Sequence, residues 1–290
     1  MSDVVEYPRE AIALALAEAP SLCAGNPFGD CSWYHTSWPV LKGLGVFISL
    51  KSDDDFLLPQ LRTALAGGAR RILISGTADA GMLARIAACR DAAPDGLDIT
   101  VLDCCPTPLA LCRQYAERAG LPIRTVQADI LNYIEGAEAY DLICTHSFLT
   151  FFDAAQRLQL VRQWHALLKP GGAVITAQRV RPDETALISR YPAEEVGALQ
   201  DKAERLAALH GAALGVDAAL ARHCAWLYGA HHRMYLIADA EQLRAPFDAA
   251  GFHLLHFAPP PADAPVADVP GAPSNAQAVR WRIFAQKSEK

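Results

Sequence analysis

The sequence predicts an α/β protein with a seven-stranded, mostly parallel sheet and helices on both of its faces. Short apolar runs alternate with longer helical patterns from about residue 70 to residue 180, and again from residue 239 to the end. Strands and helices in alternation are typical of a parallel sheet whose crossover helices cover both faces. The run Ile72-Leu73-Ile74 is wholly apolar, as a strand covered on both faces requires.

The stretch 70–103 is predicted to be a single strand–helix–strand unit. Its first strand leads into Gly76, which lets the backbone turn sharply and come close to a ligand. A helix begins near Gly81 or Met82, and its free amides favour a carboxylate or a phosphate. The second strand ends with Asp103, whose carboxylate is well placed to accept hydrogen bonds from two ribose hydroxyls. Such a unit is the smallest part of a parallel sheet that holds a nucleotide-like ligand.

Turn and capping residues divide the following chain in the same way. Thr107 and Pro108 open a helix that Gly120 ends, and Asp153 with Gln156 forms a capping box for a later helix. The remaining strands are expected, in order, at 123–127, 140–144, 173–177, from 251–252 onward, and at 279–285.

The last third of the chain interrupts this alternation and then resumes it. Residues 181–235 are predicted to form two or more helices, inserted beside the carboxyl ends of the strands, where an open α/β sheet binds ligands. We interpret the insertion as a substrate cap, and a dimerisation element that makes a homodimer is the competing interpretation. A helix at 239–250 returns the chain to the sheet, and the proline-rich stretch 258–275 is expected to be an extended surface loop.

The N-terminal part is predicted to be mainly helical. A first helix is expected to end at Pro20, and a turn-rich stretch with Trp33, Tyr34 and Trp38 follows it. This aromatic stretch is either a plug over the core or a lid that closes on bound ligands, because aromatic faces attract cations and closure excludes water. The acidic run 53–55 is most simply the solvated start of the next helix.

The totals bound the class of protein. At 290 residues, with 52% hydrophobic and 20% charged residues, the chain is expected to be soluble and globular. The expected division is an N-terminal helical or lid segment (1–68), a ligand-binding domain (69–180 and 236–290) and the cap (181–235). A net charge of −6 without a cluster of Lys and Arg argues against a nucleic-acid partner. No apolar run in the sequence reaches the length of a membrane span.

The cysteines indicate a cytoplasmic protein. None of the 8 cysteines forms a C-x-x-C pair, and several lie inside expected strands or helices. Buried, reduced thiols fit this distribution better than a zinc site or a disulfide framework, so no metal site is expected. Acidic residues before the apolar run at 11–17 also argue against a secretory signal peptide.

These features, in this order, resemble the class I S-adenosylmethionine-dependent methyltransferases, which have a Rossmann-like fold. The turn S-G-T-A-D-A-G, residues 75–81, stands where that family has its Gly-rich loop, and Asp103 stands at its ribose-binding acid. Asp129 follows the third strand, where the family has an acidic residue near the adenine amine, and His146 follows the fourth. The resemblance covers about residues 70–177. It implies S-adenosyl-L-methionine as cofactor and methyl transfer to an oxygen or nitrogen of a small-molecule acceptor.

The resemblance also implies which residues bind the cofactor. They stand at the ends of successive strands: Ser75, Gly76, Thr77, Ala78, Asp79, Asp103, Cys104, Ala128, Asp129, Ile130, Thr145 and His146. The loop departs from the family pattern, which commonly has an acid where Ile74 stands and glycines where Ala78 and Ala80 stand. An alanine costs little where its φ is negative. Cys104 is interpreted either as a side chain against the adenine ring or as a small buried residue.

His146 is the best candidate for a general base. In the family this position faces the transferable methyl group, and histidine titrates near neutrality. A histidine satisfied by neighbouring backbone is the alternative. His35 is a further candidate if the aromatic stretch is a lid, and His231 is one at the end of the cap. The run 231–233, together with Arg179 and Arg181, would gather positive charge that suits an acceptor with a carboxylate, although charges at a helix end are more often solvated.

Other classes of function stay open. Nicotinamide-dependent reductases share the nucleotide-binding unit, but no tyrosine here is followed four places later by lysine, as the short-chain reductases require. A protein that kept the fold, lost catalysis and serves as a scaffold is favoured by the altered loop. A methyltransferase that acts on protein side chains is the remaining alternative.

Overall fold

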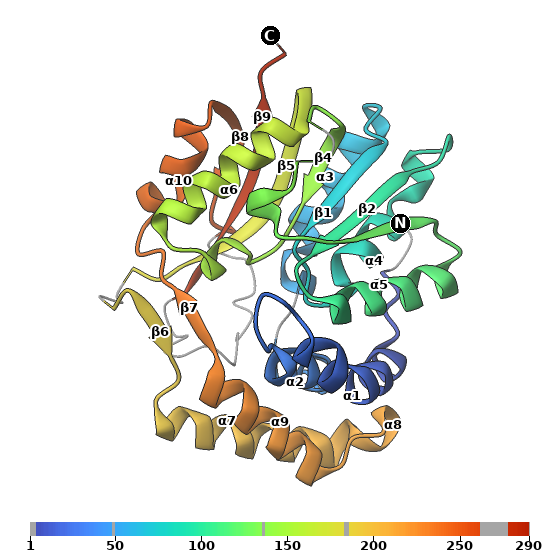
Figure 1. Ribbon diagram of the computed structural model, residues 1–290, viewed down its shortest axis with the longest axis vertical. Helices are drawn as coiled ribbons and strands as arrows, with labels where there is room; N and C mark the ends of the chain where they lie inside the picture. The colour runs from blue at the N-terminus through green and yellow to red at the C-terminus, as the bar shows by residue number, and fades with distance from the viewer. Residues whose placement is uncertain (1–3, 48–49, 135–136, 183–185, 262–277, 290) are drawn as a thin grey trace.

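The computed structural model describes residues 4–47, 50–134, 137–182, 186–261 and 278–289. It contains a seven-stranded sheet in the order β3-β2-β1-β4-β5-β9-β8 (Figure 1). Pairing is parallel from β3 to β5, and β9 runs antiparallel to both β5 and β8. Its strands are β1 Arg71–Ser75, β2 Asp98–Asp103, β3 Ile123–Gln127, β4 Tyr140–Cys144, β5 Leu168–Val180, β8 Phe252–Ala258 and β9 Val279–Lys287. The predicted α/β class and sheet are confirmed.

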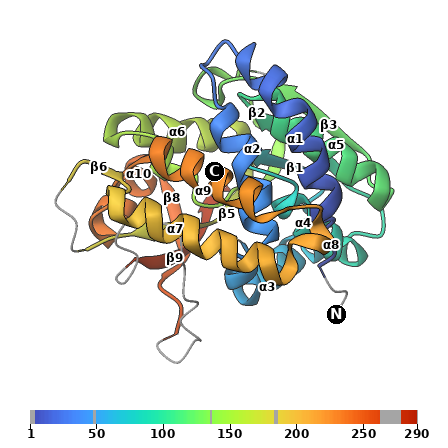
Figure 2. The ribbon, with the colours of Figure 1, turned by 90° about the horizontal axis from the view of Figure 1, so that it is seen from below.

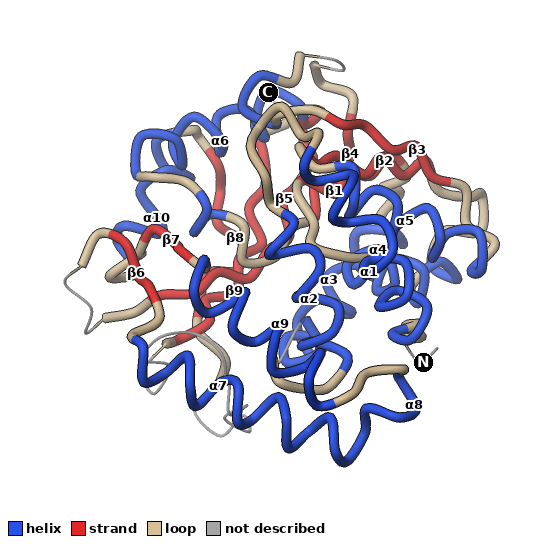
Figure 3. The backbone as a smooth tube through the Cα atoms, turned by 60° about the horizontal axis from the view of Figure 1, so that its bottom comes forward, coloured by secondary structure: helices blue, strands red, loops and turns tan. Residues whose placement is uncertain are grey.

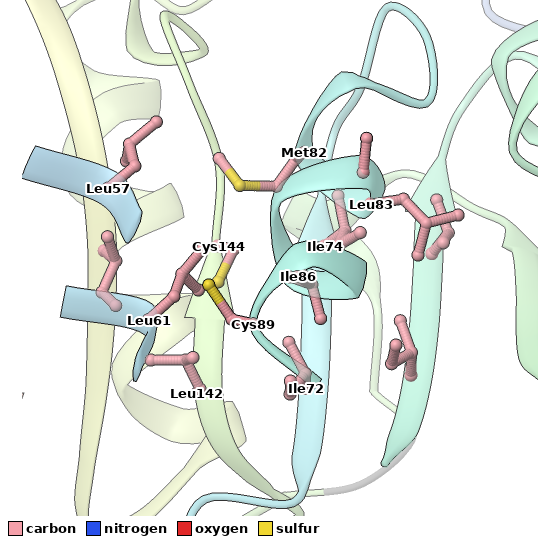
Figure 4. Packing of buried hydrophobic residues seen from close by; sticks show 14 of the residues in the cluster. Leu57, Leu61, Ile72, Ile74, Met82, Leu83, Ile86, Cys89, Leu142 and Cys144 are labelled. Carbon is pink, nitrogen blue, oxygen red and sulfur yellow. The ribbon is translucent and has the colours of Figure 1, made fainter. Parts of the chain in front are cut away.

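Helices cover both faces of this sheet. Alternate residues of each strand point to opposite faces, and both sets of side chains are apolar and pack against helices. On one face, Ile72 and Ile74 of β1 pack with Leu57 and Met82 of the helices above them (Figure 4). On the other face, Leu73 packs in a separate cluster with residues of two further helices. The first layer comprises α3 Asp54–Ala66, α4 Gly81–Ala88 and α5 Pro106–Ala119, and the second comprises α6 Ala154–Leu167 and α10 Ala240–Ala249.

A third group of helices lies across the carboxyl ends of the parallel strands (Figures 1 and 2). N-terminal residues such as Leu41 and Phe47 share one hydrophobic cluster with Leu199 and Tyr228 of the insertion. The elements of this group are α1 Pro8–Ala24, α2 Ser32–Gly43, α7 Ala193–Leu206, α8 Ala212–Leu214 and α9 Ala218–His231, with a two-stranded sheet of β6 Ile188–Arg190 and β7 Arg233–Tyr235. Helices α7 and α9 run side by side (Figure 3), and α9 also packs on α2.

The N-terminal helices differ from the prediction. Pro20 does not end the first helix, which continues to Ala24. Its last turns carry the fully buried Ala19 and Cys23, which pack against Cys105, and this packing outweighs the loss of one backbone hydrogen bond at a proline. The aromatic stretch, predicted to be rich in turns, contains α2.

Some boundaries further along the chain also differ. Helix α5 begins at Pro106 with Cys105 as its N-cap residue, so the predicted start at Thr107 is too late. Strand β5 begins at Leu168 and passes through Pro170, because its pairing with β4 shifts register there and a bulge tolerates a residue without an N–H group. Strand β6 lies where a helix was predicted.

Two predictions concern the surface and the membrane. The predicted proline-rich loop falls largely on residues 262–277, which lie outside the described residues. Within the part of the chain that the structure describes, no helix combines the length and the apolar character that crossing a bilayer requires.

Candidate functional site

The residues predicted to bind a ligand lie at the carboxyl edge of the sheet. Strand β1 lies between β2 and β4, so the order of connections reverses beside it. The loops that follow parallel strands meet at such a switch point, which is the usual ligand site of an open α/β sheet. Gly76, Asp103, Asp129 and His146 lie at or just beyond the ends of β1, β2, β3 and β4.

Gly76 makes the sharp turn predicted after β1. Its φ of 71° lies in the left-handed region, and its N–H donates to the carbonyl of Leu102 at 2.8 Å. A Cβ atom at this position would overlap the ring of Phe148, which follows β4. Glycine is therefore required both by the backbone conformation and by the close approach of an aromatic ring.

Replacing Gly76 with alanine is expected to lower the free energy of unfolding by about 2–5 kcal/mol, because it adds backbone strain and overpacking. Urea unfolding measures the change. Gly197→Ala in α7 is the matched control, since a Cβ there meets no atom within 4 Å. It is expected to raise stability by about 0.5–1 kcal/mol through helix propensity. Equal effects of the two substitutions would contradict the packing described at Gly76.

Asp103 ties the loop after β1 to the loop after β2. Its Oδ2 accepts the N–H of Thr77 at 2.9 Å, and its Oδ1 accepts the N–H of Cys105 at 2.8 Å. Burial raises the pKa of this carboxyl group, although His35 and the two amides oppose the shift. A carboxylate keeps lone pairs beyond these two bonds, so it can still accept hydrogen bonds from ribose hydroxyls. Cys104 is exposed, so the interpretation as a small buried residue is wrong.

The other residues of the first loop mostly bond to the protein itself. Ser75 is fully buried, and its hydroxyl accepts the indole N–H of Trp164 in α6 at 2.9 Å. The hydroxyl of Thr77 donates to the carbonyl of Asp79 at 2.5 Å. Ala80 has a φ of −76°, and Ala78 is not among the described non-glycine residues with positive φ. The alanines therefore fit where the family pattern has glycines.

Asp79 joins the loop to the N-terminal helices. Its carboxylate accepts hydrogen bonds from the Gly81 N–H at 2.6 Å, from Trp38 Nε1 at 2.8 Å and from Lys42 Nζ at 2.9 Å. Burial alone would raise the pKa of Asp79, but the Lys42 ammonium holds it below its usual value. The amide end of α4, predicted to attract a carboxylate, is thus capped by one from its own loop.

The loop after β3 borders a cavity of about 410 Å³, whose lining includes Phe28, Ala128 and Asp129. The Ala128 N–H donates to the carbonyl of Asp103 at 3.1 Å, and Ile130 is buried in the core. Asp129 accepts the N–H of Leu131 at 2.9 Å, so it caps the short turn that follows. The cavity lies where the resemblance places the adenine ring.

A larger cavity of about 600 Å³ lies beside the start of α4, between α1, α3 and α5. Several of its charged residues pair with one another: Glu6 lies 2.7 Å from Lys42 and 2.5 Å from Arg85. The lining also includes Asp79 and Gly81, so this cavity borders the loop after β1. The ligand site at the carboxyl edge of the sheet stays a prediction.

His146 belongs to a buried network of charges. Its Nε2 lies 3.0 Å from a carboxylate oxygen of Asp53 and 2.8 Å from a guanidinium nitrogen of Arg280. Arg280 and Arg282 also bind Asp53, at 2.8 and 3.3 Å. Burial lowers the pKa of His146, although Asp53 opposes this. Burial would raise the pKa of Asp53, but His146 and Arg280 hold it well below its usual range.

The position of Asp53 corrects the prediction for the acidic run. Asp53 is only 1% exposed, so it is not part of a solvated helix start. The partners of His146 are side chains and not neighbouring backbone groups. The adjacent Thr145 is buried, and its hydroxyl has no partner among the described residues.

A second group of cations lies under the cap, around Arg179 of β5. No hydrogen bond or ion pair joins the Arg179 side chain to the described residues, and burial, with the charges of Arg280 and Arg181, lowers its pKa to about 10. His232 is buried, and in the described part of the chain neither of its ring nitrogens has a partner. The Tyr191 hydroxyl likewise has none there. Burial and the charges of Arg179 and Arg181 lower the pKa of His232 to about 3.

The predicted positive run 231–233 is therefore only partly correct. His232 turns inward and stacks on Tyr228 at 4.7 Å, whereas His231 and Arg233 are exposed. The Nδ1 of His231 lies 2.9 Å from the carbonyl of Leu227 in its own helix. The inward-facing histidine of the cap is thus not the one predicted as a catalytic candidate.

The aromatic stretch packs between the cap and the loop after β1. Tyr34 and Trp38 lie 6.0 and 6.4 Å from Tyr228, ring centre to ring centre. The ring of His35 lies 5.1 Å from that of Tyr34, and its Nδ1 lies 3.5 Å from the Sγ of Cys23. The stretch covers the edge of the sheet as a plug does, and its opening as a lid stays a prediction.

A family model described as a methyltransferase domain matches residues 77–172. A carboxy-S-adenosyl-L-methionine synthase of Yersinia pestis (strain Pestoides F) is 30% identical over 93 residues, which are 31% of this chain and 34% of that protein. The chain therefore matches about a third of that relative's length.

Solved structures share the fold. The apo form of the S-adenosylmethionine-dependent methyltransferase SibL is 19% identical, with a TM-score of 0.50 over 99% of this chain and 71% of that one. The [4+2]-cyclase SpnF is 18% identical, with a TM-score of 0.50 over 80% of this chain and 82% of that one. The second structure is described as a cyclase, so the fold alone does not define the reaction.

Proposed function

We propose that this chain, a member of the class I S-adenosylmethionine-dependent methyltransferases, methylates an oxygen or nitrogen of a small molecule that carries an anionic group. The anionic group of the acceptor is proposed from Arg179. Its guanidinium is half-buried, has no ion pair among the described residues and lies close to the inward-facing His232. Unpartnered polar groups that converge under a cap are typical of a ligand site.

The residues at the carboxyl edge of the sheet support the proposal that S-adenosylmethionine binds there. Asp103 is fixed by two backbone amides and keeps lone pairs for ribose hydroxyls. The cavity beside Asp129 and the exposed Cys104 provide space for an adenine ring. When bound, S-adenosylmethionine would supply an electrophilic methyl group, which an acceptor oxygen or nitrogen would attack in line with the sulfur–methyl bond, so that S-adenosylhomocysteine leaves.

The Asp53–His146 pair supports proton removal from the acceptor. In the tautomer with its proton on Nε2, His146 donates to Asp53 across 3.0 Å and leaves the Nδ1 lone pair for the acceptor, and the neighbouring Arg280 guanidinium then donates to Asp53 and not to Nε2. The Asp53 carboxylate would then stabilise the imidazolium that forms. Arg280 holds Asp53 ionised and in place.

The arginines under the cap support recognition of the acceptor. The positive charges of Arg181 and Arg280 repel the positive charge of Arg179. A carboxylate beside Arg179 would relieve this repulsion and accept a forked pair of hydrogen bonds. The buried hydroxyl of Tyr191 and the ring of His232 would supply neutral contacts around it.

The test is methyl transfer from isotopically labelled S-adenosylmethionine to a panel of small acceptors. The panel contains hydroxy and amino carboxylates, each paired with its neutral amide. We expect labelled products from the carboxylates at about 10–100 times the rate of the amides, the effect of one charge-assisted contact. Faster reaction of the amides would contradict the anionic acceptor. Cofactor binding without transfer to any acceptor would favour the scaffold instead.

The pH profile tests His146 as the base. Because burial lowers its pKa, the acidic limb of kcat/KM for a hydroxyl acceptor is expected below pH of about 6.5, the ordinary pKa of histidine. His146→Asn should lower kcat by about 10²–10⁴-fold and remove this limb. His253→Asn, on an exposed part of β8, is the control. A His146→Asn enzyme with the parental limb would contradict the role.

A further inference from the structure

Four side chains with metal-binding atoms meet where the N-terminal helices contact the end of β2. The ligand atoms of Cys23, Cys31, His35 and Cys105 all lie within 4.8 Å of one another. The Sγ of Cys23 lies 3.5 Å from the Sγ of Cys105 and 3.5 Å from the Nδ1 of His35. A tetrahedral zinc ion, with Zn–S of about 2.3 Å and Zn–N of about 2.0 Å, places its ligand atoms about 3.5–3.8 Å apart. The two distances from the Sγ of Cys23 therefore match a tetrahedral site, and the other ligand atoms lie within 4.8 Å of one another.

The cluster is also closed to solvent. Cys23 and Cys105 are fully buried, and His35 is 6% exposed. Only Cys31 is half-buried. Structural zinc sites have four protein ligands and no open position, whereas catalytic sites keep a position for water or substrate.

The surroundings suit bound thiolates. Cys31 is the N-cap residue of α2 and Cys105 is that of α5, so the positive ends of two helix dipoles face the sulfur atoms. The side-chain amide of Asn26 donates to the Sγ of Cys31 at 3.6 Å, and the Thr107 hydroxyl lies 3.2 Å from the Sγ of Cys23. Donors of this kind stabilise the excess negative charge that three thiolates leave around a divalent ion.

We propose that Cys23, Cys31, His35 and Cys105 bind one structural Zn²⁺ ion. The ion would fasten α1 and α2 to the core at a point two residues beyond Asp103. It would thereby fix the position of the aromatic stretch over the predicted cofactor site. The proposal opposes the prediction of no metal site, which rested on the missing C-x-x-C pairs. Folding brings together ligands that are far apart in the sequence, and a motif search does not find them.

The experiment uses the full chain, purified anaerobically with a thiol reductant and dialysed against zinc. Elemental analysis by mass spectrometry is expected to find about one zinc per chain, as four-ligand sites bind one ion. Replacement by Co²⁺ should give the intense visible absorption of a tetrahedral thiolate complex. Cys31→Ser and Cys105→Ser should each weaken zinc binding by about 100-fold or more. Cys112→Ser is the control, because Cys112 is fully buried in α5, the helix that Cys105 precedes as N-cap residue, but lies outside the cluster.

Hydrogen exchange gives a second readout that does not depend on activity. On removal of zinc by a chelator, amides of α1 and α2 are expected to exchange about ten times faster or more, while α10 is unchanged. Folded, reduced parent protein that holds no zinc would overturn the proposal. A disulfide between Cys23 and Cys105 in anaerobic protein would also overturn it, as would full zinc content in Cys31→Ser. Because Cys31 is half-buried, that variant provides the test if Cys105→Ser does not fold.

Discussion

Asp103→Asn is expected to weaken the binding of S-adenosylhomocysteine by about 30–200-fold, the value of a charge-assisted hydrogen bond or two. In the native protein, both carboxylate oxygens accept backbone amides, from Thr77 and Cys105. An asparagine must turn its own NH₂ group toward one of these amides, so one donor faces another. The loop after β1 then loses its anchor, and the side chain also loses the negative charge that we propose attracts two ribose hydroxyls.

Calorimetric titration measures this loss, and urea unfolding measures the accompanying change in stability. We expect the variant to lose about 1–3 kcal/mol of unfolding free energy through the unsatisfied buried amide. The control is Asp98→Asn, at the exposed start of the same strand, where the carboxylate lies 3.3 Å from Arg71. Its affinity should match that of the parent. An Asp103→Asn protein with parental affinity would remove Asp103 from the cofactor site.

Arg179→Met is expected to raise the KM for an anionic acceptor by about 10–100-fold, while the affinity for S-adenosylhomocysteine is unchanged. The guanidinium has no ion pair among the described residues, and Arg181 and Arg280 repel it. Its removal should therefore leave stability unchanged or raise it by about 1 kcal/mol, in the direction of a stability–activity trade-off. If Arg179 had a purely structural role, its replacement would lower the unfolding free energy of the protein instead.

The matched control for this substitution is Arg222→Met on the surface of the cap. Arg222 lies 2.7 Å from Asp201 and 2.8 Å from Glu204, and its side chain is 43% exposed. Exposed ion pairs contribute little to stability, so the unfolding free energy should change by no more than about 1 kcal/mol. The KM for the anionic acceptor should stay unchanged. If Arg179→Met leaves the KM unchanged for every anionic acceptor, the arginines under the cap do not bind the substrate.

The strands and most helices of the sheet could be predicted because local signals specify them. Apolar runs locate β1, β2 and β4, and the Asp153 capping box forms at the start of α6 as predicted. The need for glycine at position 76 could likewise be predicted from the sequence, since few other residues make such a turn. The helices that differ are those decided by tertiary contacts. Pro20 lies inside α1 because the buried Cys23 packs beyond it.

Side-chain partners from distant parts of the chain could not be predicted in the same way. Asp53 looked like an ordinary acid at a helix start, and only the fold brings it to His146 and Arg280. The ring of Phe148 over Gly76 is a contact of the same kind. In the cap, the choice between His231 and His232 depends on a rotation of about 100° per helical residue at the end of α9, which a short sequence pattern does not resolve.

The most direct test of the central claim is calorimetric titration of the parent protein with S-adenosylhomocysteine, with NADH as a parallel ligand. We predict one-site binding of S-adenosylhomocysteine and no binding of NADH. That result would establish the cofactor and direct the search to anionic acceptors under the cap. Folded protein that binds NADH, or that does not bind S-adenosylhomocysteine, would contradict the assignment of the carboxyl edge of the sheet as the site of a methyltransferase cofactor.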